Sequence, residues 1–187
     1  MDTIEKFITQ VLQGGDLMQT ARHEAGHRFM WRLACPEVAT HYVVTGGLPA
    51  VVQTSSHSRK ISEMSMEDAS KMTYIKLAGH VSEMMYLGLT SDEDIEAIVD
   101  WLVKDYYSKP SRLDWRDDAN CNGDISEAFL MIGGKVGWSR ENLKQNTLAI
   151  FKSIIHAIQA NEVEYEAECN EAYQQFAVWQ AQGKIII

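Results

Sequence analysis

Residues 17–34 carry two histidines four positions apart, His23 and His27, within the run ARHEAGHRFMW. Asp16 stands where a side chain caps the start of a helix, and Pro36 stands where a helix has to stop. Residues i and i+4 of a helix lie one turn apart, about 40° from each other around the axis. The segment therefore predicts a helix that turns both imidazoles toward the same neighbour.

Two imidazoles in this arrangement predict a zinc site. Zinc accepts imidazole nitrogens at about 2.0–2.1 Å, and a catalytic site uses three protein ligands and keeps one position open. Glu24 is turned about 100° from His23, so it flanks the ion without binding it, where a general base for the attacking water has to stand. The pattern His-Glu-x-x-His fixes only three positions, so by itself it also fits two ordinary histidines that hold no metal.

The composition excludes several classes of protein. With 187 residues, 45% of them hydrophobic, the chain is expected to form one globular domain over residues 1–187. Its net charge of −9 argues against a nucleic-acid binder, which needs clustered Lys and Arg. The sequence contains no run of about 18 apolar residues, so it predicts no membrane span. The N-terminal segment lacks the features of a signal peptide. Three widely spaced cysteines predict free thiols in a reducing cytoplasm, while the oligomeric state stays open.

Outside residues 17–34, the sequence predicts mainly helices. Residues 40–56 are rich in Val, Thr and Tyr and are interrupted by Gly-Gly-Leu-Pro, which predicts a β-hairpin beside the histidine helix. The predicted fold class is therefore mainly α with one small hairpin. Further helices are predicted over residues 2–12, 65–87, 91–107, 124–132 and about 139–182, the last with a break near Asn161.

Residues 20–31, with Ala25 and Gly26 between the histidines, closely resemble the zinc helix of the FtsH-type ATP-dependent zinc metallopeptidases, which show His-Glu-Ala-Gly-His. The run KLAGHVSEMMYLG, residues 76–88, is similar to the family's Leu-Ala-Gly-Arg-x-Ala-Glu-x-x-x-x-Gly helix, with His80 in place of the arginine. Between them, VVTGGLPAVVQT is similar to the family's strand pair. The resemblance covers residues from about 17 to 135 and implies a helical zinc-peptidase domain.

The resemblance also implies a third zinc ligand, an aspartate that begins a helix in the pattern Asn-Asp-Leu-x-x-Ala. Asp124, in NGDISEAF, is followed by an apolar residue and has alanine four residues on. Asp94, in DEDIEAIV, lacks that alanine but lies nearer to the family's usual separation from the second motif. We favour Asp124, which makes residues 91–107 an inserted helix.

The expected function is that of a zinc metallopeptidase that cleaves flexible or unfolded polypeptides, with Zn²⁺ held by His23, His27 and Asp124 and with Glu24 as the base. No Gly-x-x-x-x-Gly-Lys-Ser/Thr phosphate loop occurs in the sequence. The domain is therefore expected to stand alone, without the family's ATPase module and membrane anchor, and to work without ATP. One alternative is an inactive relative that serves as an interaction module. Another is a regulatory protein whose zinc is structural and closed by a fourth ligand, with Cys121 as the candidate.

Overall fold

The computed structural model describes residues 2–12, 15–53, 64–108 and 123–187. Within these ranges the chain is mainly helical and has one small antiparallel sheet of two strands, which confirms the predicted fold class. The elements are α1 (Thr3–Phe7), a π-helical turn (Ile8–Leu12), α2 (Leu17–Ala34), β1 (Thr40–Thr45), β2 (Leu48–Gln53), α3 (Met66–Tyr86), α4 (Asp92–Ser108), α5 (Asp124–Val136), α6 (Arg140–Ala160) and α7 (Glu162–Ala181).

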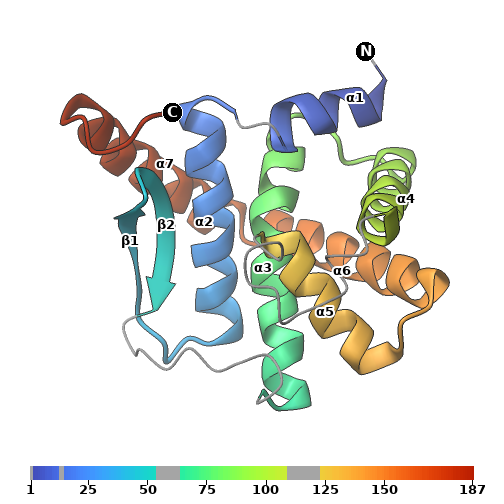
Figure 1. Cartoon of the computed structure of the whole chain (residues 1–187). Helices are drawn as coiled ribbons and strands as arrows, with labels where there is room; N and C mark the ends of the chain where they lie inside the picture. Colours follow the sequence, from blue (N-terminus) through green and yellow to red (C-terminus); the bar gives the residue numbers. More distant parts are fainter. Residues whose placement is uncertain (1, 13–14, 54–63, 109–122) are drawn as a thin grey trace.

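Helices α2 and α3 run side by side through the middle of the molecule (Figure 1). The hairpin and α7 pack against α2, while α5 and α6 pack against α3 and α4 packs against α6. A methyl group at Gly26 of α2 would lie 2.5 Å from the carbonyl oxygen of Ala78 and 2.8 Å from Cβ of Ser82, both on α3. The glycine in the middle of the histidine motif is therefore what allows the two helices to approach so closely.

The ends of these two helices follow from their capping residues. The carboxylate of Asp16 accepts a hydrogen bond from the backbone N–H of Gln19 at 2.9 Å and starts α2 as predicted. Ser65 does the same for the N–H of Asp68 at the start of α3, at 3.0 Å. The two helices that contribute most to the site therefore begin at fixed residues.

The predicted hairpin is present and confirmed. Its two strands pair antiparallel from Thr40 opposite Gln53 to Thr45 opposite Leu48, and Gly46 and Gly47 form the turn. Both glycines have positive φ angles, 60° and 83°, as a tight two-residue turn requires. Residues 54–56 of the predicted segment lie outside the described ranges. The hairpin lies beside α2 (Figure 1). Of its two strands, β2 contacts α2 more than β1 does.

One boundary of the prediction was wrong. The glycine-rich run after Ile132 does not end α5, which continues through Gly133 to Val136 and stops at Gly137, where φ is 92°. A methyl group at Gly133 would lie 2.5 Å from the ring of Trp138. Gly133 thus serves close packing inside a helix. Residues 109–122, which include Cys121, lie outside the described ranges.

The core is apolar and is shared by elements from both ends of the chain. Phe7, Phe129, Phe151 and Phe176 are each fully buried, and all four belong to one continuous hydrophobic cluster. Among the residues that the structure describes, no helix is both long and apolar enough to cross a membrane.

Candidate metal centre

Three of the predicted site residues lie together between α2 and the start of α5. The Nε2 atoms of His23 and His27 are 3.0 Å apart. Oδ2 of Asp124, the first residue of α5, lies 3.0 Å from Nε2 of His27 and 3.5 Å from Nε2 of His23. Ligands placed tetrahedrally around zinc at 2.0–2.1 Å are separated by about 3.3 Å, so the spacing of these atoms fits one small cation.

The second nitrogen of each imidazole is already engaged. Nδ1 of His27 donates to the backbone carbonyl oxygen of Ile75 at 2.7 Å, and Nδ1 of His23 donates to Oε2 of Glu83 at 2.8 Å. A carbonyl and a carboxylate only accept, so each ring carries its proton on Nδ1 and turns the lone pair of Nε2 inward. Two nitrogen lone pairs and a carboxylate oxygen therefore converge, an arrangement that needs a positive charge between them.

The pKa values of these groups reflect the same convergence. Burial alone would raise the pKa of Asp124, but the neighbouring imidazoles of His27 and His23 and the ammonium of Lys76 outweigh it and keep that pKa far below its ordinary value. Burial alone would lower the pKa of His23, but hydrogen bonds to Asp124 and Glu83 raise it well above its ordinary value. The raised pKa means that His23 can itself carry a positive charge beside the two carboxylates.

Asp124 is held from its other side by a lysine. Nζ of Lys76 lies 2.9 Å from Oδ1 of Asp124 and 2.9 Å from Oε2 of Glu127, which stands one turn further along α5. The lysine therefore engages one oxygen of Asp124 and leaves the other, Oδ2, to face the histidines. Such supporting contacts fix the orientation of a ligand before a metal binds.

Space for an ion is provided by Gly79 of α3. A methyl group at this position would lie 2.6 Å from Nε2 of His27 and 2.8 Å from Nε2 of His23. Any side chain there would crowd the point on which the donor atoms converge. The glycine thus keeps a cradle open beside the two imidazoles, and the donor set and the space together fit a small metal ion.

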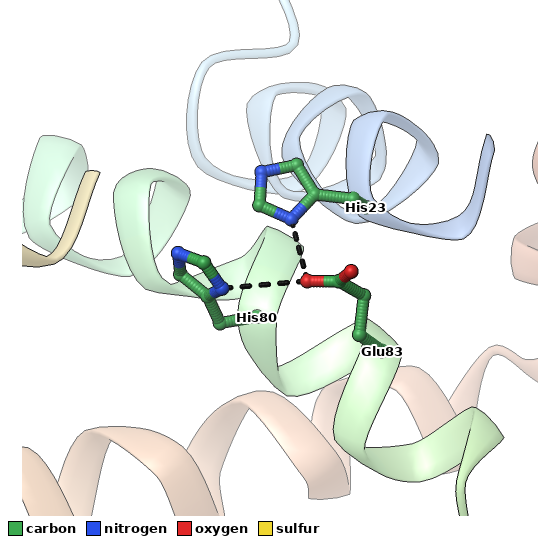
Figure 2. A group of neighbouring side chains, drawn as sticks. All are labelled: His23, His80 and Glu83. Atoms are coloured by element: carbon green, nitrogen blue, oxygen red, sulfur yellow. Dashed lines mark hydrogen bonds and ion pairs between the residues drawn. The ribbon is translucent and has the colours of Figure 1, made fainter. Parts of the chain in front are cut away.

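Glu83 also contacts a third histidine. Figure 2 shows its carboxylate, on α3, between the rings of His23 and His80, with Oε2 facing both. Nδ1 of His80 lies 3.3 Å from Oε2 but makes no hydrogen bond to any residue that the structure describes. The rings of His23 and His80 meet edge to face at 4.8 Å. Glu83 is almost completely buried, whereas the side chains of His23 and His80 are partly exposed, and the three residues form a second group of potential metal ligands.

The predicted base, Glu24, lies partly buried on α2 beside the hairpin. Its carboxylate accepts a hydrogen bond from the backbone N–H of Val51 in β2. Burial raises the pKa of Glu24 above its ordinary value, although the nearby His23 and His27 counteract part of that effect. A carboxylate with a raised pKa beside a metal centre is suited to accept a proton and to release it again.

The alternative third ligand, Asp94, lies elsewhere. Its Oδ1 accepts a hydrogen bond from the hydroxyl of Thr3 at 2.9 Å, and its Oδ2 accepts one from the hydroxyl of Ser91 at 2.7 Å. It therefore joins α4 to the N-terminal helix. Cys121, the proposed fourth ligand of a closed site, lies outside the described residues.

Sequence reasoning missed the residues that support the ligands. Ile75, Lys76, Gly79 and Glu83 all belong to α3, and each acts on one or both histidines or on Asp124. All but Ile75 lie in the run 76–88 that resembles the family's second motif, but the resemblance assigned them no role, because their contacts join positions that are far apart in sequence. A comparison of the chain with protein-family models, with curated proteins and with solved structures finds no match.

Proposed function

We propose that this chain is a zinc metallopeptidase that cleaves flexible or unfolded polypeptides without ATP. The observation that carries the proposal is the convergence of three acceptor atoms at separations of 3.0–3.5 Å, with both histidine Nδ1 atoms engaged elsewhere. His23, His27 and Asp124 would hold the ion. The similarity of residues 17–135 to the FtsH-type peptidases supports the same function.

The chemistry would be shared between the ion and the chain. Zinc held at this site would supply Lewis acidity, which makes water nucleophilic near neutral pH and polarises a carbonyl group. Glu24 would take a proton from the attacking water and pass it to the leaving nitrogen. Asp124, kept ionised by the histidines and by Lys76, would contribute the negative charge of the ligand set.

The free edge of β2 is the proposed place of the polypeptide. Among the residues that the structure describes, the strand pairs with β1 alone, and the N–H of Val51 on its other side is directed at Glu24. An extended peptide would add to this edge by donating hydrogen bonds to the carbonyl groups of Pro49 and Val51, because the N–H of Val51 is already directed at Glu24. Such backbone bonds do not read side chains. Pro49 lies two residues earlier on the same edge, where the missing N–H interrupts no bond to β1.

The test is a substitution that changes the base and keeps the ligands. Glu24→Gln should bind zinc as the wild type does and lose cleavage of an unfolded protein, because an amide cannot take up the proton. Cleavage at the wild-type rate would exclude Glu24 as the base. A wild-type protein that binds zinc but cleaves no unfolded protein or peptide would favour the interaction module instead.

A further inference from the structure

A buried carboxylate outside the metal centre joins three elements of the fold. Glu168 lies on α7, and its side chain is only 1% exposed. Its Oε1 accepts hydrogen bonds from Arg28 of α2 at 2.7 Å and from the hydroxyl of Tyr42 in β1 at 2.8 Å. Its Oε2 accepts one from Arg32 of α2 at 2.9 Å. Helix α7, the metal-centre helix α2 and the hairpin therefore meet at one side chain.

A second pair joins the same two helices without the hairpin. Arg22 of α2 and Glu166 of α7 form two parallel hydrogen bonds of 2.8 Å. In the described part of the chain, these bonds link Glu166 to α2 alone, and its side chain is 43% exposed. The two glutamates differ in one respect that matters for the site, since only Glu168 reaches β1.

The contact with Tyr42 leads directly to the proposed base. Tyr42 stands opposite Val51 in the register of the hairpin, and the N–H of Val51 bonds to Glu24. The ring of Tyr42 is also covered by the guanidinium of Arg28, at 4.7 Å, and meets the ring of Phe176 edge to face at 5.2 Å. Tyr42 is therefore a point at which the hairpin is attached to the helices.

We infer that Glu168 is a positioning residue that holds the hairpin against α2, so that the free edge of β2 lies along the peptide site. The inference rests on the proposed function for its effect on substrate. The attachment itself does not depend on catalysis. A hydrogen bond to a buried carboxylate is stronger than one between neutral groups, which suits a contact that has to fix a strand of only six residues.

The decisive variant is Tyr42→Phe, which removes the hydroxyl and with it the bond of the hairpin to Glu168 and the contact of that hydroxyl with Arg28. Both arginines keep their bonds to Glu168. The matched control is Glu166→Gln, which weakens another link between α2 and α7, the pair of Glu166 with Arg22. Amide hydrogen exchange of residues 48–53 and the kinetics of peptide cleavage are measured on both variants and on the wild type.

We expect Tyr42→Phe to accelerate exchange of the Val51 amide roughly tenfold, the effect of losing one hydrogen bond to a charged group. KM should rise several-fold, while kcat stays within about a factor of two because the metal ligands are untouched. Glu166→Gln should change neither the exchange of the hairpin nor KM.

The inference would be overturned if the amide hydrogens of β2 exchanged at the same rate in the wild type and in Tyr42→Phe. Equal acceleration in Glu166→Gln would also overturn it, because the hairpin would then respond to any loosening of α7. If the wild-type protein cleaves no peptide, the proposed function fails. The exchange measurement still decides whether Glu168 positions the hairpin.

Discussion

Two carboxylates packed against α2 make opposite kinds of contact. Glu168 meets two guanidinium groups and a hydroxyl, all of them donors. Oδ2 of Asp124 meets two imidazole nitrogens whose protons are on the far side of their rings. Both oxygens of Glu168 meet donors, whereas Asp124 meets a donor, Lys76, at Oδ1 and faces the two imidazole nitrogens with Oδ2. Glu168 thus belongs to an ion cluster within the fold, whereas Asp124 and the two histidines form a group that could hold a metal ion.

The two sides of α2 differ in packing as well. On the side toward α3, glycines allow the backbones of the two helices and the histidine side chains to lie close together. On the side toward α7, long arginine side chains of α2 bond to glutamates of α7. One helix thus carries a compact site on one face and its attachment to the rest of the fold on the other. The predictions below test this division.

The largest effect is expected on zinc affinity, from removal of Asp124, the carboxylate that faces the imidazole nitrogens. Asp124→Ala should weaken zinc binding by more than the 10- to 100-fold that is typical of losing a supporting residue, because it removes a ligand. Asp94→Ala is the control, since that carboxylate also lies in the first turn of a helix but bonds Thr3 and Ser91. Zinc affinity is measured by competition with a chelator. Loss of affinity in Asp94→Ala, with Asp124→Ala unchanged, would move the site to α4.

Removal of Glu168, the carboxylate that is surrounded by donors, should instead lower the stability of the fold. Glu168→Ala leaves two arginines and a tyrosine without their buried partner, and we expect it to cost about 3–5 kcal/mol of unfolding free energy. Glu166→Ala breaks a pair that is partly exposed and should cost about 0–1 kcal/mol. Urea unfolding of both variants gives the comparison. Similar losses in the two variants would show that Glu168 is no more important than a surface ion pair.

Gly79→Ala tests the space beside the ligands. The added methyl group would lie 2.6–2.8 Å from atoms of both histidines, and relieving such a contact costs about 1–3 kcal/mol. Zinc affinity should therefore fall roughly 10- to 100-fold. Gly134→Ala, where the methyl group meets nothing within 4 Å, should leave zinc binding unchanged and stabilise α5 by up to about 1 kcal/mol. Equal zinc affinities in the two variants would mean that the cradle is not needed.

A smaller effect is expected at Lys76. Lys76→Met keeps the length of the side chain but releases Oδ1 of Asp124, and zinc affinity should fall about tenfold. Lys71→Met is the control on the same helix, because Lys71 pairs with the exposed Glu67 in α3 itself. Isothermal titration with zinc distinguishes the two variants. A tighter binding in Lys76→Met would show that the positive charge of the lysine opposes the metal more than it orients the ligand.

The fold and part of the site were readable from local patterns. The i, i+4 spacing predicted that His23 and His27 share one side of a helix, and the caps at Asp16 and Ser65 gave the helix starts. The preference for Asp124 over Asp94 came from a short pattern that the resemblance implied. The structure brings Asp124 to the histidines, although about 100 residues separate them.

The supporting contacts were not readable, because they join residues that are far apart in sequence. Glu83 lies 60 positions from His23, and Glu168 lies 126 positions from Tyr42. Local patterns carry no information on such pairs until the packing of α2, α3 and α7 is known. The wrong end of α5 has the same origin, since Gly133 serves a contact with Trp138 that no local rule anticipates.

The zinc content of the purified protein tests the central claim most directly. Protein prepared without chelators or added metal should contain one zinc per chain by elemental analysis, because the donors of His23, His27 and Asp124 are already placed for one ion. The variant in which all three are changed to alanine should contain none. A wild-type protein that holds no zinc, and takes up none on titration, would contradict the account.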